Sequence, residues 1–333
     1  MDIENLLYDL TQTHSAGHIN FSATVLKKVL EKCSKVTLND SYLKAEVGES
    51  FQKSVMLEAH LDQVAMIVTC VYDSGFLRVS PVGAIDGRIL PATPVLIYGK
   101  EILKGVFTSI PPHLKKEDVT PNFDNLFVDT GNLNAKNLIS EGDLVFFDYP
   151  PAKLANNRFA ASGLDDKAGC ACAVSAFCEL ASLNLPIHIT LMLSMGEELG
   201  LRGAAVGAYK EIADSCIAVD VSFGNHPEIP SHKTAPLGSG AMIGISPILS
   251  KRIYTALLNI AKENNIPFST EVMGGKTGTD ADVISITKGG IPTALLSIPL
   301  RNMHCPLEVV DLKDLNAVTK LLVNFVKEEA ENA

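Results

Sequence analysis

Five short segments of the sequence carry a carboxylate or an imidazole at a place where an enzyme can use it. Each of these side chains follows a predicted strand or begins a predicted helix. The segments are His60-Leu61-Asp62, Asp165-Asp166, Glu197-Glu198, Asp220 and His304. In open α/β sheets, ligands bind outside the carboxyl ends of the strands. We therefore expect the five segments to meet at one site, although they lie far apart along the chain.

The triplet His60-Leu61-Asp62 follows an apolar run that begins at Ser54. Side chains two residues apart in an extended chain face the same side. Asp62 is therefore expected to orient the His60 ring by accepting its second N–H, as carboxylates do beside metal-binding histidines. Taken alone, such a triplet is more often a strand that ends in a polar turn.

The pair Glu197-Glu198 follows the apolar run 187–193 and is flanked by Gly196 and Gly200, which permit a tight turn. Two adjacent carboxylates at the end of a buried strand repel each other and need a cation or water nearby. A metal ligand beside a general base satisfies this need. An exposed acidic turn at a helix N-terminus satisfies it equally well.

Asp165, Asp220 and His304 each have an ordinary structural role open to them. Asp165 and Asp166 precede an apolar helix, where one can cap backbone N–H groups while the other points into a cleft. Asp220 is flanked by valines, and burying its carboxylate is costly unless it is paired. His304 follows the last predicted strand and is otherwise an ordinary loop histidine.

The combined set is more informative than any of its members. Two imidazoles and three carboxylates suit divalent ions such as zinc, cobalt and manganese. The set consists of His60, Asp165, Glu198, Asp220 and His304. Two divalent ions bring four positive charges, which the three carboxylates and an ionised Glu197 would balance. The sequence therefore predicts two divalent metal ions per chain, with zinc as the first candidate and cobalt and manganese as alternatives.

Strand and helix patterns alternate over most of the chain that carries these residues. Helices are predicted at 3–10, 22–33, 166–183, 201–212, 250–264, 281–288 and 311–329, and strands at 36–38, 42–47, 54–57, 187–194, 215–221 and 293–298. This alternation predicts a mixed, doubly wound α/β sheet with helices on both faces. Between residues 68 and 154, short β-prone runs separated by Gly and Pro predict a small β-barrel or sandwich. We therefore expect a catalytic domain of residues 1–67 and 155–333, interrupted by a β-rich insertion at 68–154.

The composition excludes several classes of protein. Of the 333 residues, 47% are hydrophobic and 20% are charged, which excludes a largely disordered chain. A net charge of −10 argues against nucleic-acid binding, which needs a basic face. Seven irregularly spaced cysteines fit a reducing compartment. The sequence shows neither a run of about 18 apolar residues nor a basic, apolar leader, so we expect a cytoplasmic protein without a membrane partner.

Taken together, these segments resemble the tetrahedral (TET) aminopeptidases, cytosolic dinuclear metallopeptidases that include glutamyl and deblocking aminopeptidases. The resemblance covers essentially the whole chain, and no single motif would be specific on its own. It rests on the order and spacing of AHLDQVAMIV (59–68), PPHL (111–114), GLDDKAG (163–169), GEELGLRGA (196–204), AVDVS (218–222), GTDAD (278–282) and IPLRNMHCP (298–306).

The resemblance implies a metal-binding role for five side chains. His60 and Asp220 would bind one metal ion, and Glu198 and His304 would bind the other. Asp165 would bridge the two ions. In this arrangement each ion receives an imidazole, one carboxylate of its own and a share of the bridging carboxylate.

The resemblance also implies an activity and an assembly. Glu197 would be the general base that activates a metal-bridging water, Asp62 would orient His60, and Asp280 is a weaker candidate for a substrate contact. The expected reaction is removal of N-terminal residues from peptides. The β-rich insertion resembles the family's dimerisation domain, so the chain is expected to form homo-oligomers between a dimer and a dodecamer.

Four residues depart from the pattern usual in this family. Gln63 and Ala65 stand near positions that usually hold an acid and a glycine. His226 stands where an acid is common, and Asn302 takes a place usually held by an aromatic residue. Because the metal and base positions are intact, these departures affect the expected substrate preference and assembly more than the expected chemistry.

Two other functions compete with the aminopeptidase. Proteins that resemble this family have been labelled endoglucanases, and paired acids can cleave glycosidic bonds. Adjacent carboxylates such as Glu197 and Glu198 do not naturally straddle such a bond, however, and the chain contains no tryptophan for stacking on sugars. The second rival is a metal-binding assembly protein without catalytic activity, against which the intact Glu197 argues.

Overall fold

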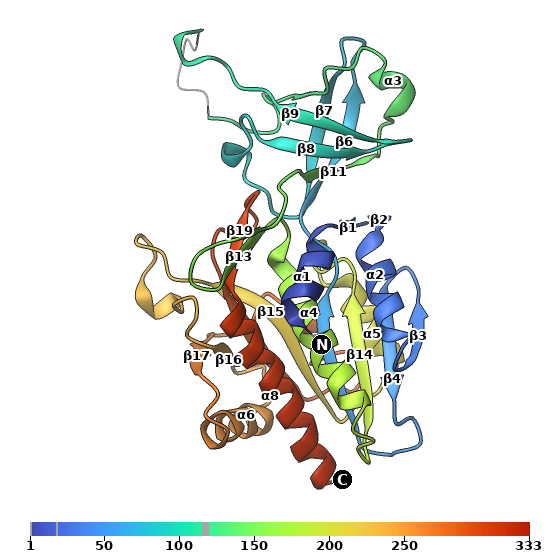
Figure 1. The fold of residues 1–333 in the computed structure, drawn as a ribbon, viewed down its shortest axis with the longest axis vertical. Helices are drawn as coiled ribbons and strands as arrows, with labels where there is room; N and C mark the ends of the chain where they lie inside the picture. Colours follow the sequence, from blue (N-terminus) through green and yellow to red (C-terminus); the bar gives the residue numbers. More distant parts are fainter. Residues whose placement is uncertain (1, 18, 115–119) are drawn as a thin grey trace.

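The computed structural model describes residues 2–17, 19–114 and 120–333, and it contains an α/β unit with a closed β-barrel beside it (Figure 1). The chain passes from the α/β unit into the barrel just after residue 60 and returns after residue 147. Among the described residues, no helix combines the length and apolar character needed to cross a membrane.

The large sheet of the α/β unit contains eight strands among the described residues. These strands are β3 (Lys35–Leu38), β4 (Tyr42–Val47), β5 (Ser54–His60), β14 (His188–Ser194), β15 (Ser215–Phe223), β16 (Ala241–Ile245), β17 (Phe268–Val272) and β18 (Thr293–Leu300). Their order across the sheet is β17-β16-β18-β15-β5-β14-β4-β3. The four central strands β18, β15, β5 and β14 are parallel, so their carboxyl ends lie at one edge of the sheet.

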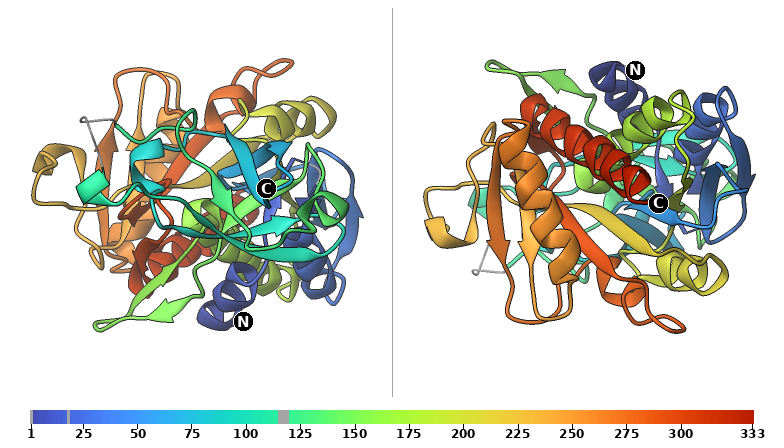
Figure 2. Two further views of the ribbon diagram at one scale, coloured as in Figure 1. Left: turned by 90° about the horizontal axis from the view of Figure 1, so that it is seen from above. Right: turned by 90° about the horizontal axis from the view of Figure 1, so that it is seen from below.

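Helices cover both faces of this sheet. They are α1 (Ile3–Thr11), α2 (Phe21–Leu30), α4 (Leu164–Ala181), α5 (Arg202–Lys210), α6 (Lys251–Glu263), α7 (Ala281–Ile284) and α8 (Leu312–Glu331). Helix α4 packs against α1 and α8 on one face, and α6 also contacts α8 there, whereas α5 and α7 contact each other on the opposite face (Figure 2). The described part of the chain therefore has the three layers expected of a doubly wound α/β fold.

Local sequence explains where these helices begin and which side they bury. The Asp311 side chain accepts the backbone N–H of Lys313 and caps α8. Leu315, Val318, Leu322 and Phe325 recur at helical spacing and are fully buried against the sheet and α4. In the central strands, β5 and β18 are buried along their whole length, as strands covered on both faces must be.

The barrel consists of six antiparallel strands, β6 (Ala65–Val71), β7 (Phe76–Val82), β8 (Pro94–Tyr98), β9 (Ile102–Phe107), β10 (Val128–Asp129) and β11 (Leu144–Phe147). It has its own apolar core, separate from the cores of the large sheet. The short helix α3 (Ala135–Leu138) lies between β10 and β11. Smaller pairings join β1 (Ser15–Ala16) to β2 (Ile19–Asn20), and β13 (Arg158–Ala161) to both β12 (Ala152–Lys153) and β19 (Glu308–Asp311).

The predicted fold class, a mixed α/β sheet with helices on both faces and a small β-barrel, is confirmed. Several strands were not expected from the sequence, among them β16, β17 and β19. Strand β17 reads Phe-Ser-Thr-Glu-Val, and none of its residues is fully buried because it lies at the edge of the sheet. A short edge strand of this kind lacks the apolar run that identifies a central strand.

The barrel contacts the α/β unit through a small aromatic cluster. The His14 ring lies 4.9 Å from the Phe146 ring, and its Nδ1 is 2.8 Å from the hydroxyl of Tyr98. Tyr98 also lies against Phe21, at the start of α2. Burial, together with the positive charge of Lys167, lowers the pKa of His14 to about 3. A neutral histidine is therefore part of the contact between the two parts of the chain.

His14 should make the stability of the protein sensitive to mild acid. Its pKa is about 3 when folded and 6.5 in the unfolded reference, so acid protonates the unfolded state first and favours it. His14 thus leaves stability unaffected above pH 6.5 and reduces it below, by up to about 1.4 kcal/mol per pH unit. Thermal unfolding at pH 7.5 and pH 5.5 should show a smaller pH-dependent drop in Tm for His14→Gln than for wild type. The exposed His226→Gln serves as control, and an unchanged drop in His14→Gln would contradict this role.

Candidate metal centre and active site

The side chains singled out in the sequence gather at the carboxyl edge of the four central strands. His60 is the last residue of β5, and Glu197 and Glu198 follow β14. Asp220 lies within β15, and the chain that leaves β18 at Leu300 leads to His304. Because parallel strands end at the same edge, four segments far apart in the sequence approach one another here.

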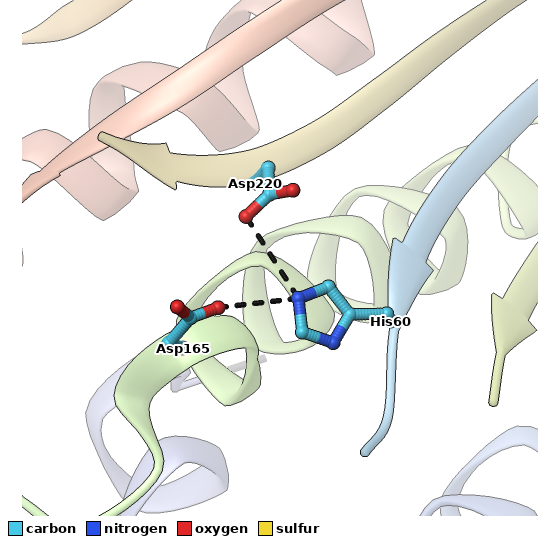
Figure 3. Close-up of side chains that lie close together, drawn as sticks. All are labelled: His60, Asp165 and Asp220. Atoms are coloured by element: carbon cyan, nitrogen blue, oxygen red, sulfur yellow. Dashed lines mark hydrogen bonds and ion pairs between the residues drawn. The ribbon is translucent and has the colours of Figure 1, made fainter. Parts of the chain in front are cut away.

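Two groups of side chains share Asp165. The His60 ring, through Nε2, lies 3.1 Å from Asp165 Oδ1 and 3.8 Å from Asp220 Oδ1 (Figure 3). The His304 ring, through Nε2, lies 3.2 Å from Asp165 Oδ2 and 3.2 Å from Glu198 Oε1. One oxygen of Asp165 therefore faces each imidazole. In each group, the potential ligand atoms lie within 4.8 Å of one another.

The second nitrogen of His60 is held by the backbone. Its Nδ1 is 3.0 Å from the carbonyl oxygen of Asp62 and 3.6 Å from the carboxylate Oδ1 of the same residue. The Asp62 carboxylate instead accepts the backbone N–H groups of Glu197 at 3.1 Å and Glu198 at 3.3 Å. Asp62 therefore meets the His60 ring most closely through its carbonyl, with its carboxylate farther away, and the same carboxylate also fixes the segment after β14.

Asp165 and Asp166 sit at the start of α4 with backbone angles outside the helical region. Asp166 accepts the N–H of Gly169 at 2.9 Å and points away from the cavity, whereas Asp165 points into it. The buried Glu308 on β19 accepts the backbone N–H of Asp165 at 3.1 Å and that of His304 at 2.8 Å. Glu308 thus fixes the backbone at two of the candidate ligands, although sequence reasoning did not identify it.

The barrel also contributes to the site. The Nδ1 atom of His304 lies 3.0 Å from the carbonyl oxygen of Ala84, in the loop that follows β7. A Cβ atom added at Gly83 would lie 3.3 Å from the Glu198 carboxylate. This loop therefore reaches the half of the site formed by Glu198 and His304, and it orients the His304 ring so that Nε2 faces the carboxylates.

The carboxylates strongly favour positive charge on both imidazoles. Burial lowers the pKa of His60, but the carboxylates of Asp165, Asp220 and Asp62 outweigh burial and raise it well above its ordinary value. Burial likewise lowers the pKa of His304, and Asp165 and Glu198 outweigh it and raise the pKa to about 11. The site thus has the electrostatic character of a cation-binding centre.

The acidic groups show the corresponding effects. Burial alone would raise the pKa of Asp165, but His304 and His60 hold it below its ordinary value. Burial raises the pKa of Asp220 to about 6 despite the opposing charge of His60. Burial also raises the pKa of Glu197 to about 9. His60 lowers this pKa, whereas the negative charges of Asp220, Asp280 and Glu198 raise it further. Carboxylates crowded in this way need additional positive charge to remain ionised together.

A cavity of about 600 Å³ opens over these groups. Its wall includes all five candidate metal ligands and Glu197. The rest of its wall consists of Leu201, Val221, Ser222, Phe223, Glu271, Met273, Lys276, Thr277, Gly278, Thr279, Asp282, Leu295, Ser297 and Met303. A larger, open cavity of about 770 Å³ lies at Lys53, Arg252 and Glu329, and none of the candidate site residues line it.

Asp280, the weaker candidate for a substrate contact, lies outside the wall of this cavity. It is 2% exposed, and its carboxylate accepts the hydroxyl of Ser194. Asp282, two residues on, does line the cavity and accepts the backbone N–H of Thr277 at 2.8 Å and that of Gly278 at 3.1 Å. In the motif at 278–282, Gly278, Thr279 and Asp282 therefore line the cavity, whereas Asp280 does not.

The departures from the family pattern lie around the site. Gln63 is buried and accepts a hydrogen bond from the Lys167 ammonium at 2.6 Å, while Lys167 also donates to the carbonyl of Thr13. Ala65 is buried at the start of β6. His226 and Asn302 line a separate cavity of about 450 Å³ that shares Phe223 and Met303 with the first.

The residues present fit two divalent ions. The first group offers His60, Asp165 and Asp220, and the second offers Asp165, Glu198 and His304. Imidazole nitrogens and carboxylate oxygens together suit zinc, cobalt or manganese. Glu198 Oε1 is buried and accepts no hydrogen bond among the described residues, although His304 is near, so a lone pair is available for a cation.

Comparison with known proteins agrees with this geometry. The sequence model of the M42 glutamyl aminopeptidase family matches residues 42–321. The lysyl aminopeptidase of Pyrococcus furiosus is 30% identical to this chain over 283 residues, covering 82% of this chain and 81% of that protein. Residues 42–321, which the family model matches, include the barrel and all the candidate site residues.

Solved structures share the whole fold. Aminopeptidase APDkam598 from the archaeon Desulfurococcus kamchatkensis has a TM-score of 0.91 at 27% identity, covering 98% of this chain and 94% of that one. The TET1 peptidase of Pyrococcus horikoshii, which can assemble into a tetrahedron or a large octahedral shell, has a TM-score of 0.86 at 26% identity, covering 97% and 98%. The resemblance to TET aminopeptidases seen in the sequence is confirmed, and the chain belongs to the M42 glutamyl aminopeptidase family.

Proposed function

We propose that this protein is a metal-dependent aminopeptidase that removes N-terminal residues from peptides by means of a water molecule activated by Glu197. Membership of a peptidase family supports hydrolysis of peptide bonds. The observation that carries the finer proposal is the convergence of two imidazoles, three carboxylates and Glu197 on one cavity. A non-catalytic metal-binding protein would have no need of the additional carboxyl group beside the ligands.

Two divalent ions, with zinc as first candidate, would be held by the two groups that share Asp165. When bound, such ions lower the pKa of a water molecule and polarise the scissile carbonyl. His60 and Asp220 would hold one ion, and Glu198 and His304 the other. The carbonyls of Asp62 and Ala84 would keep the two imidazole rings in the orientation that presents Nε2.

Glu197 would act as the general base and then as the general acid. Its carboxyl group lines the cavity beside His60, Asp165 and Glu198. In that position it can take a proton from the attacking water and deliver it to the nitrogen of the leaving amine. Asp62 would be a positioning residue, because its carboxylate holds the backbone N–H groups of Glu197 and Glu198.

A free α-amino group would be the feature of the substrate that selects its N-terminus. The cavity is lined by several carboxylates, which favour a positively charged ammonium over an internal peptide segment. The names of related proteins do not fix the side chain that is removed. The family name refers to glutamate, whereas the Pyrococcus furiosus relative is named for lysine.

The barrel would serve as an inserted domain that assembles copies of the chain. We assign residues 1–67 and 155–333 to a catalytic domain and residues 68–154 to the insertion, although the barrel strand β6 begins slightly before this boundary, at Ala65. The separate apolar core of the barrel supports this division. The shell-forming TET1 peptidase shares the fold, which supports a homo-oligomer between a dimer and a dodecamer.

Digestion of one peptide in two forms tests the proposed activity. The metal-loaded protein should release single residues in order from the N-terminus of an unblocked nonapeptide, as followed by mass spectrometry. The N-acetylated form of the same peptide should remain intact, because it lacks the ammonium group. Internal cleavage of the acetylated peptide, or cleavage of a β-glucan in place of either peptide, would refute the aminopeptidase and favour an endopeptidase or the glycan hydrolase.

A further inference from the structure

One side chain in the cavity has no part in the proposed chemistry. Glu271 lies on β17, the strand at the edge of the sheet, and its half-buried carboxylate lines the cavity that contains the candidate metal ligands. Its partner across the ladder is Gly244 on β16. The Glu271 side chain crosses β16 and reaches the next strand, β18.

Two serine hydroxyl groups fix the Glu271 carboxylate. Ser297 on β18 donates to Oε2 at 2.6 Å, and Ser222 on β15 donates to Oε1. Both serines are buried. Ser297 is the direct neighbour of Asp220 in the β15–β18 ladder, so the serine that holds Glu271 lies one strand spacing, about 4.8 Å, from a candidate metal ligand. The carboxylate is therefore rigid and close to the reaction site without belonging to it.

The Glu271 carboxylate has both charge and hydrogen-bonding capacity left for a ligand. Among the described residues, no lysine, arginine or histidine nitrogen lies within 4.0 Å of it. An ionised carboxylate accepts about four hydrogen bonds, and each oxygen here receives one from a serine. A lysine ammonium, with three donors, would complete this arrangement.

The wall of the cavity near Glu271 is partly apolar. Leu295, which is 1% exposed, and Met273 line the same cavity and pack against each other. A lysine side chain has a flexible four-carbon stem that packs along apolar surface while its charged end remains with polar groups. An apolar wall beside a fixed carboxylate matches the chemistry of that side chain.

Lys276 also lines the cavity, and its ammonium group could bind a substrate with an acidic side chain. It lies on the loop between β17 and α7 and forms no hydrogen bond or ion pair within the described part of the chain. Glu271, in contrast, is held by two buried partners. A group that is held in place before the substrate binds gives better specificity than a mobile one. Glu271 is therefore the better candidate for the residue that determines substrate specificity.

We propose that Glu271 selects peptides whose N-terminal residue is lysine or arginine. This inference rests on the proposed function, because it takes the cavity as the place where the N-terminal residue binds. Glu271 would touch the side chain of that residue and not its reacting bond. Ser222 and Ser297 would be positioning residues that hold the carboxylate in place.

The wild-type protein provides the first test. Lysine and norleucine p-nitroanilides share an aliphatic stem, and only lysine carries the ammonium group. We expect kcat/KM for lysine to exceed that for norleucine by about 10- to 100-fold, the range set by a hydrogen bond to a charged group. Equal rates for the two substrates, or faster cleavage of a glutamate p-nitroanilide, would overturn the proposal. Absence of cleavage of every free-amine substrate would instead refute the aminopeptidase itself.

Glu271→Gln is the matching variant. It should lower kcat/KM for lysine by about 10- to 100-fold and leave that for norleucine within about threefold. Retained norleucine cleavage shows that the variant is folded. Glu263→Gln, on the exposed side of α6, is the control and should change neither rate. An equal loss for both substrates would overturn the proposal, because Glu271 would then bind the α-amino group common to all substrates.

A binding measurement removes the dependence on turnover. Calorimetry of the metal-loaded protein with free L-lysine and L-norleucine should show tighter binding of lysine, and Glu271→Gln should abolish the difference. Lys276→Met should preserve or increase the preference for lysine. If Lys276→Met lowers the ratio of lysine to norleucine cleavage as strongly as Glu271→Gln does, the assignment to Glu271 fails.

Discussion

Replacing Glu197 by Gln is expected to lower kcat by about 10²- to 10⁴-fold, the contribution typical of a positioned general base. The amide keeps the size of the side chain but cannot take a proton from water. Glu197 belongs to neither group of candidate ligands, so the variant should bind as much metal as the wild type. Steady-state kinetics together with elemental analysis of the metal content measures both quantities.

Two comparisons make this result specific to Glu197. Glu228→Gln, at an exposed position in the neighbouring cavity, should retain wild-type kcat and metal content. Loss of metal from Glu197→Gln would mean that Glu197 is a ligand. Wild-type turnover by Glu197→Gln would remove the base from the mechanism.

Replacing Asp165 by Asn should have a different effect: loss of metal. The two oxygens of Asp165 face the two imidazoles, so this single carboxylate serves both groups. We expect the purified variant to hold almost no metal and to be inactive. Added metal should raise the Tm of the wild type, since a ligand at 100 times its Kd stabilises the folded state by about 2.7 kcal/mol. The same addition should leave the Tm of Asp165→Asn almost unchanged.

The neighbouring residue provides a close control. Asp166 lies outside both groups of potential ligands; it accepts the N–H of Gly169 through Oδ1 at 2.9 Å and that of His60 through Oδ2 at 3.4 Å, and the oxygen of an asparagine can keep the shorter of these bonds. Asp166→Asn should therefore keep both metal ions. If Asp165→Asn instead retained two tightly bound ions, the bridging role would have to be abandoned.

The sequence was sufficient to predict the fold class and the convergence of the candidate side chains at one edge of the sheet. Buried parallel strands leave a plain signal, because they are continuous apolar runs that end in a polar residue, as at His60 and after Ser194. Where such strands run parallel, their carboxyl ends must meet. The approach of His60, Asp165, Asp220 and His304 follows from that rule together with the family resemblance.

Contacts that depend on three-dimensional detail could not be predicted in the same way. Whether the carbonyl or the carboxylate of Asp62 meets His60 depends on the turn after β5, since both are a short distance from the ring. Glu271 was overlooked because β17 is a short, half-exposed edge strand. Its pairing with Gly244, which places the side chain near the cavity, cannot be read from the sequence. The contact between Ala84 and His304 joins residues 220 positions apart, on the barrel and the α/β unit.

The central claim is that metal ions bound by the two groups sharing Asp165 are required for hydrolysis of an N-terminal peptide bond. The most direct measurement is a titration of metal-stripped protein with zinc, cobalt or manganese while cleavage of a lysine or leucine p-nitroanilide is followed. We predict no cleavage without metal and a rise to full activity at about two ions per chain, as a two-metal site requires. Full activity of the stripped protein would contradict this account. Failure to cleave any free-amine substrate with two ions bound would contradict it as well.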